Sequence, residues 1–131
     1  PFVVEILDEA FSKIETMRFF YSPNLIKIGS RGFWGCQSLF RIDCPNLEIV
    51  GSHSFDDAFS LTHINLENVR RFGQNCLSCC AIQEIRNQKC LNTTNLTFCD
   101  NPSLEFLDFE NLQEFDFRNF RGCSNLKFLR M

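Results

Sequence analysis

The sequence lacks a long apolar run, and its opening lacks the features of a secretion signal. No stretch reaches the roughly eighteen consecutive apolar residues of a membrane-spanning helix, and PFVVEILDEAF has no basic start before an apolar block. Neither feature is visible, so we expect no direct membrane insertion. Because the first residue is Pro rather than Met, we expect an excerpt or a processed product whose targeting segment lies elsewhere.

A charge excess of one sign is also missing. The chain has 13 Lys and Arg against 16 Asp and Glu, a formal net charge of -3, and the charges are scattered along the sequence. A field of this kind attracts neither nucleic acid nor an acidic membrane surface. We therefore expect no nucleic-acid partner.

Motifs of catalysis are absent as well. The sequence contains no glycine-rich phosphate loop, no metal-binding motif and no nucleophile elbow. His53 and His63 have no cysteine or serine at a spacing that implies a catalytic pair. We expect no enzymatic activity, no metal and no cofactor.

What the chain has in abundance is phenylalanine, with sixteen Phe against one Trp and one Tyr in 131 residues. These rings recur with a period of 22 residues, and other apolar residues fall in register with them. One residue is lost after Leu77, and the period then resumes. The columns are Phe11, Phe33, Phe55, Leu77, Phe98 and Phe120; Met17, Leu39, Leu61, Ile82, Leu104 and Leu126; Phe20, Ile42, Ile64, Ile85, Leu107 and Leu129; and Ile6, Ile28, Val50 and Phe72.

Six copies therefore cover the chain, which we interpret as a single repeat domain over residues 1–131. The fifth copy, about residues 90–112, is the most eroded and has Thr93 and Thr94 where others have an aliphatic residue and Gly. A unit of about 22 residues buries too little apolar surface alone, whereas stacked units bury each other's faces. Gly29, Gly51 and Gly73 form a further column and mark corners that tolerate no bulky side chain.

Each copy predicts one short strand and one turn. The alternation in Leu39-x-x-Ile42-x-Cys44 places Ile42 and Cys44 inward and their neighbours outward. The i, i+3 spacing of Phe33 and Cys36 suits a single helical turn on the opposite side. Strands pack about 4.8 Å apart and bulkier turns need more room, so we expect an α/β solenoid with a parallel sheet on the concave face and helical turns on the convex face.

The segment Ile28-Gly29-x-x-Gly32-Phe33-x-x-Cys36-x-x-Leu39-x-x-Ile42-x-Cys44-Pro45 resembles the BspA-like class of leucine-rich repeats, with its pattern I-G-x-x-A-F-x-x-C-x-x-L-x-x-I-x-I-P. The chain departs from this pattern at several places, since Pro is kept only at Pro23 and Pro45. The resemblance implies a right-handed solenoid of surface proteins that mostly bind other macromolecules. Adhesion is the function usually proposed for such proteins, although a fold does not fix a function.

The outward strand positions are the surface that a concave sheet presents to a ligand. Exposed aromatics with interleaved Arg and Asp match the composition of protein-binding hot spots, so we expect a protein or glycoprotein partner here. The alternative is that the charges only pair with one another across strands and the rings only cover the sheet. The positions are Phe19, Tyr21, Arg41, Asp43, His63, Asn65, Glu84, Arg86, Phe106, Asp108, Phe128 and Arg130.

Two placements of the molecule stay open. A recognition or adhesion module at the cell surface or outside the cell is our first interpretation, and an intracellular scaffold or regulatory module of the same fold is the alternative. The sequence shows no polar capping unit at either end, so we also expect a fragment of a longer array or end-to-end self-association. The sequons at Asn92 and Asn95 predict glycosylation if the chain is secreted.

Eight cysteines are too few for a small disulfide scaffold. The family pattern places Cys36, Cys80 and Cys123 in the buried turn, as free thiols. A disulfide from Cys76 or Cys79 to Cys99 is one alternative, a zinc half-site in Cys76-x-x-Cys79-Cys80 is a weaker one, and all thiols free is the leading one. Outside these columns, we expect Asn24, Asn46, Asn68 and Asn111 to hydrogen-bond turn backbone between copies.

Overall fold

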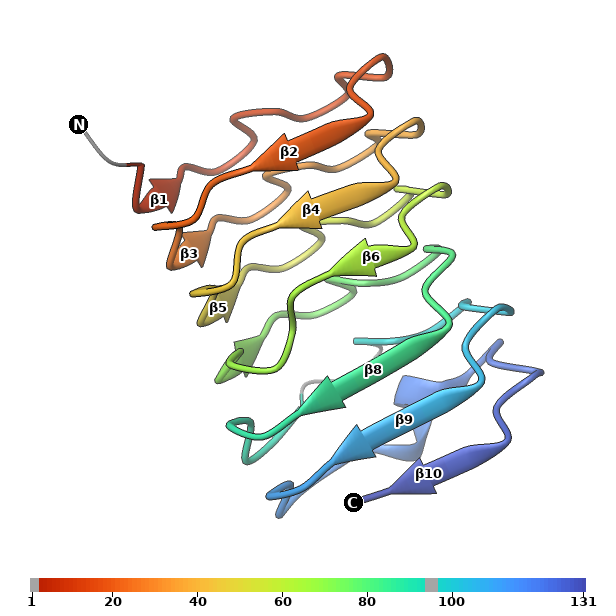
Figure 1. Ribbon diagram of the computed structural model, residues 1–131. Coiled ribbons are helices and arrows are strands. Elements are labelled where there is room, and N and C mark those ends of the chain that lie inside the picture. Colours follow the sequence, from red (N-terminus) through yellow and green to blue (C-terminus); the bar gives the residue numbers. More distant parts are fainter. Residues whose placement is uncertain (1–2, 94–96) are drawn as a thin grey trace.

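The computed structural model, which describes residues 3–93 and 97–131, is a parallel β-solenoid of about six coils (Figure 1). A first strand row runs along one side of the stack and a second strand row along the other. The first strand row consists of β2 (Phe19–Tyr21), β4 (Arg41–Asp43), β6 (His63–Ile64), β8 (Glu84–Asn87), β9 (Phe106–Phe109) and β10 (Phe128–Arg130). The second strand row consists of β1 (Glu5–Ile6), β3 (Lys27–Ile28), β5 (Ile49–Val50) and β7 (Arg71–Phe72).

The strand register repeats the period of the sequence. Phe19 pairs with Arg41, and Arg41 pairs with His63, each 22 residues further along the chain. Glu84 pairs with Phe106 in the same way. Among the described residues, every pair of hydrogen-bonded strands is parallel, as a stack of equivalent coils requires. The predicted parallel strands are therefore confirmed.

The predicted helical turns on the convex side are wrong. Among the described residues the helix is confined to one short 3-10 turn, η1 (Phe117–Phe120). The reason is the direction of the backbone hydrogen bonds. The amides of Phe11, Phe33 and Phe55 donate to carbonyls of the next coil, at 2.8 to 3.0 Å, instead of to carbonyls of their own segment. A helix needs those donors within its own turn, so the segment becomes a chain of tight turns. A left-handed residue recurs in each coil, at Lys13, Gly35, Asp57, Cys79, Asp100 and Gly122.

The second strand row is a finding that the sequence did not predict. Its strands are two residues long, too short to show an alternating pattern. The glycines that follow these strands were expected at corners. The backbones of neighbouring coils approach each other so closely at these positions that a side chain would not fit. A Cβ built on Gly51 would lie 2.6 Å from the backbone carbon of Gly29 in the neighbouring coil, which is inside van der Waals contact.

The phenylalanine column is stacked as predicted. Ring centroids lie 5.3 Å apart between Phe11 and Phe33 and 5.4 Å apart between Phe33 and Phe55, with nearly parallel planes in the second pair. Phe33 and Phe55 are fully buried. Around the eroded fifth copy the packing changes: Phe72, Phe98 and Phe109 form a three-ring cluster with centroids 5.6 to 6.0 Å apart, which fills the interior where the column is irregular.

Buried asparagines hold the coils together where the repeat loses register. The Asn87 side chain donates to the carbonyls of Leu66 and Val69 (2.7 and 2.8 Å) and accepts from the amides of Lys89 and Cys90 (3.0 and 2.8 Å). It is 1% exposed. Asn101 and Asn119 are buried in the same manner and bond backbone of their own and neighbouring coils.

We predict that Asn87→Ala lowers the free energy of unfolding by about 2–4 kcal/mol, because it leaves several buried backbone groups without partners. Urea unfolding followed by circular dichroism measures this. The matched control is Asn111→Ala, which removes one exposed bond to the Gln88 carbonyl (2.9 Å) and should cost less than about 1 kcal/mol. Equal losses in the two variants would contradict the assignment.

Candidate functional site

We define the outer face as the outward side chains of the first strand row. Strand alternation sets it: Ile42 is buried while Arg41, before it, is exposed. Eleven of the twelve predicted positions lie within β2, β4, β6, β8, β9 and β10, and Asn65 lies directly after β6. The Asn65 side chain accepts a hydrogen bond from the Cys44 amide at 2.8 Å, so it joins neighbouring coils.

Exposure differs along this face. Tyr21 is 62% exposed and Phe19 49% exposed, and Phe128 is 42% exposed at the other end. Large aromatic side chains of this exposure are what protein-binding surfaces offer. Asp108 departs from the expectation, since it is only 4% exposed.

An aromatic and cationic stack covers the C-terminal half of the outer face. The rings of Phe106 and Phe128 lie 4.4 Å apart and almost parallel. The Arg86 guanidinium lies 4.5 Å from the centroid of the Phe106 ring, in cation–π contact. Three consecutive coils therefore contribute one layer each to a continuous, ordered patch.

Asp108 is buried because two arginines close over it. Arg130 binds it in bidentate fashion, with Nε–Oδ1 at 2.7 Å and Nη2–Oδ2 at 2.6 Å. Arg86 approaches Oδ2 at 3.8 Å and also pairs with Glu84. The predicted pair of Arg86 and Asp108 is thus present, and these contacts hold both guanidinium groups in place over the buried carboxylate while the arginine side chains stay exposed. The charges pair with one another, whereas Phe128 stays exposed and Phe106 partly exposed. Binding of a partner by these residues stays a prediction.

The N-terminal half of the outer face carries a smaller network. Arg41 Nε lies 2.8 Å from Asp43 Oδ2, and His63 Nε2 lies 3.2 Å from Asp43 Oδ1. The hydrogen bond from Arg41, with the charge of that guanidinium and of His63, lowers the pKa of the Asp43 carboxyl. The same bond raises the pKa of Arg41.

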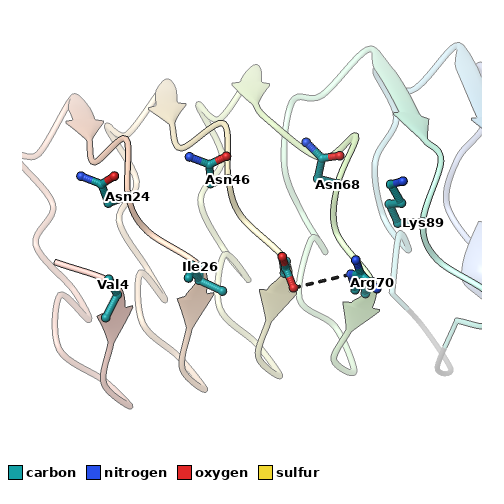
Figure 2. A pocket seen from close by; sticks show the side chains of 8 residues that line it. Val4, Asn24, Ile26, Asn46, Asn68, Arg70 and Lys89 are labelled. Carbon is teal, nitrogen blue, oxygen red and sulfur yellow. Dashed lines mark ion pairs between the residues drawn. The ribbon is translucent and has the colours of Figure 1, made fainter. Parts of the chain in front are cut away.

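A groove that the sequence did not predict runs along the stack between the two strand rows (Figure 2). It has a volume of about 580 Å³. One wall carries Asn24, Asn46 and Asn68 in a row, with Lys89 in the same place of the next coil, and the other wall includes the Glu48–Arg70 pair at 3.5 Å. The 22-residue recurrence of these asparagines was the signal that could have located it.

The predicted structural role of the asparagine column is confirmed for Asn46, Asn68 and Asn111, and for Asn24 it stays a prediction. Asn46 donates to the Pro23 carbonyl at 2.8 Å, and Asn68 donates to the Pro45 carbonyl at 3.3 Å. Asn111 bonds the Gln88 carbonyl in the same way. Each amide thus joins its coil to the preceding one.

All eight cysteines are free thiols in the structure. The column of Cys36, Cys80 and Cys123 lies in the interior, and each thiol donates to the carbonyl of a column phenylalanine, at 3.0 to 3.3 Å. The structure contains no disulfide from Cys76 or Cys79 to Cys99. Burial is the main cause that raises the thiol pKa throughout.

Among the described residues, one group of potential metal ligands lies together, namely Asp56, Asp57 and Cys79, with ligand atoms within 4.8 Å of one another. Burial first, and then the surrounding carboxylates, raise the pKa of Cys79 to about 11. A metal bound here would therefore have to displace the thiol proton. The candidate zinc ligands Cys76 and Cys80 do not belong to this group.

The two predicted glycosylation sites fall in the irregular fifth copy. Asn92 is exposed and forms a single bridge to Glu114. Asn95 lies outside the described residues. Use of either sequon stays a prediction.

Comparison with known families agrees with this geometry. A family model described as BspA type leucine-rich repeat region matches six copies over residues 4–127. The chain belongs to the BspA-type leucine-rich repeat family. No curated protein and no solved structure matches this leucine-rich repeat chain at a significant level. In the described part of the chain, every helix is too short to span a bilayer.

We predict that the Asp43 network stabilises the solenoid fully at pH values above the ordinary carboxyl pKa, near 3.9. This stabilisation is lost as the pH falls toward and through the lower pKa that Asp43 has in the folded state. The folded state holds the carboxylate ionised to lower pH than the unfolded chain, so the unfolded chain takes up the proton first. Urea unfolding of wild type and Asp43→Asn between pH 7 and pH 3 should give a stability difference that narrows with acidification.

The control for this titration is Arg41→Gln, which removes the main cause of the shift. In that variant the pKa of Asp43, measured by NMR, should rise toward its ordinary value. A difference between wild type and Asp43→Asn that is constant with pH would contradict the assignment.

Proposed function

We propose that this BspA-type repeat protein binds a partner protein or glycoprotein through the outer face, as a recognition or adhesion module at a cell surface. The leucine-rich repeat family supports a protein-interaction module. The observation that carries the proposal is the ordered patch of Arg86, Phe106 and Phe128. Aromatic and arginine side chains fixed before binding lose little conformational entropy on association.

Cell-surface placement rests on the family resemblance and on the sequons. A specific observation also favours the alternative of an intracellular scaffold, because all eight cysteines are free thiols and disulfides persist mainly in oxidising compartments. Contact between copies through β2 and β10, each of which pairs with one neighbour, stays a prediction.

The two placements predict different intact masses for natively expressed protein. A cell-surface protein should carry glycan mass at Asn92 or Asn95, or should have lost thiol hydrogens. An intracellular protein should show the unmodified mass with eight alkylatable thiols after unfolding. Peptide mapping after glycosidase treatment locates the modification, and an unmodified mass would contradict the cell-surface placement.

We predict that changing Tyr21, Arg41, Arg86 and Phe106 to Ala reduces recovery of bound partners at least about tenfold, since hot-spot residues each contribute more than about 1 kcal/mol. Quantitative affinity capture from native extracts compares this variant with wild type. The matched control changes four exposed residues outside the outer face, namely Lys13, Glu15, Phe59 and Arg121, to Ala. Equal recovery by wild type and the outer-face variant would move the binding site elsewhere.

A further inference from the structure

The first strand row is interrupted in its middle. Its strands form two separate sheets, β2-β4-β6 and β8-β9-β10. In other neighbouring coils, the carbonyl just before the strand accepts the amide of the next strand, as Phe40 does from His63 (3.2 Å) and Gln83 from Phe106 (3.1 Å). No described hydrogen bond joins β6 to β8 in this way, and Figure 1 shows them spaced more widely than the other strands of the row.

The backbone groups that face this interruption follow from the bonds on its two sides. Because the Gln83 carbonyl points to β9, the amide of Glu84, in the same peptide plane, points toward β6. Because the His63 amide points to β4, the Thr62 carbonyl points toward β8. One side of the interruption therefore offers an acceptor and the other offers a donor.

A slot of about 410 Å³ lies at this place. Ile64, Leu66 and Ile85 contribute apolar lining, and Glu67 and Glu84 lie among its polar lining. The coils touch again beyond both ends: the Ala81 amide donates to the Leu61 carbonyl (2.9 Å), and the Gln88 amide donates to the Glu67 carbonyl (3.1 Å). Residues 62–66 lie between these two contacts on the β6 side, so the slot is about five extended residues long.

The slot coincides with the lost residue of the repeat. Leu61 and Ile82, which occupy one column, are separated by 21 residues instead of 22. The shortened segment leads directly into β8. The sheet is therefore opened at the one coil where the chain is too short to keep β8 in line with β6.

The slot lining has a small acidic excess, since Glu67 and Glu84 stand against Arg86, with His63 beside them. The Glu67 side chain has no ion-pair partner among the residues that the structure describes, whereas Glu84 is paired with Arg86. Arg86 in turn contacts Phe106, so the slot is continuous with the aromatic patch of the outer face. A basic side chain entering here would meet an unpaired carboxylate.

We propose that the slot binds a short extended segment of a partner protein by strand addition, with alternate apolar side chains toward Ile64 and Ile85 and a basic side chain beside Glu67. Unpaired strand edges present donors and acceptors that a peptide main chain matches on both of its sides. The inference rests on the proposed function, and names the part of the partner that the outer face recognises.

The test uses the full chain and the fluorescein-labelled peptide Val-Lys-Val-Lys-Val, capped at both ends, whose alternation is the same in either direction. Fluorescence anisotropy should show saturable binding. N-methylation of both lysine amides keeps the side chains and removes two main-chain donors, and it should weaken binding about tenfold or more. Equal binding of the two peptides would overturn strand addition.

Two variants locate the site. Glu67→Lys should weaken binding of the lysine peptide and favour Val-Glu-Val-Glu-Val, whereas Glu15→Lys, an exposed glutamate outside the slot, has the same charge change and should leave both affinities unchanged. An Ala inserted after Cys80 restores the 22-residue step and should abolish peptide binding. Unchanged binding in Glu67→Lys, which keeps the coil length, would overturn the site even if the insertion variant failed to fold.

Hydrogen exchange followed by NMR gives a direct readout. Peptide binding should slow the exchange of the Glu84 amide more than that of Phe106, which is already bonded. No change at Glu84 would overturn the proposal, and so would a dimer in sedimentation that the peptide does not dissociate, because a second copy would then fill the slot. If the slot variants behave as wild type while the outer-face variant still loses its partners, the slot inference fails and the proposed function stands.

Discussion

The structure depends on hydrogen bonding between coils that repeat every 22 residues. Each coil donates to its neighbour along both strand rows and along the turn segments that carry the phenylalanine column, so no coil is complete alone. This constraint places equivalent side chains directly above one another and produces the Phe11–Phe33–Phe55 stack. It also explains the glycine column, where neighbouring backbones approach too closely for a Cβ.

The same constraint separates what the sequence could predict from what it could not. Column residues such as Phe33 and Ile42 were placed correctly because stacking turns a sequence period into spatial neighbours. The convex turns were misread because the spacing of Phe33 and Cys36 suits a helix and a chain of turns equally, and apolar spacing does not reveal where the amides donate. Asp108 was expected outward, and it is covered by the bidentate contact of Arg130 from the next coil together with the approach of Arg86.

The lost residue of the repeat removes backbone hydrogen bonds between two coils, and buried asparagine side chains supply hydrogen bonds in their place. Between the third and fourth coils the ladder of the first strand row is missing, and Asn87 supplies four side-chain bonds to backbone on either side. Such a side chain can donate and accept at once, which a cysteine or leucine in its place could not. Within residues 3–93 and 97–131, every buried side-chain nitrogen and oxygen has a hydrogen-bond partner, so the opened sheet is compatible with a stable solenoid.

This compatibility bears on how the outer face can bind. Its charges are largely satisfied within the chain, as at Asp108 and Asp43, so a partner gains little from competing for them. The groups that a partner can still bind are the exposed aromatic surface and the backbone groups of β6 and β8 that face the interruption. A partner that covers Phe106 and Phe128 while pairing its main chain with those edges would gain both apolar burial and hydrogen bonds. The interruption of the repeat then sets where along the outer face the partner binds. A regular strand ladder would have no unpaired edge within the row and would present the same surface at every coil.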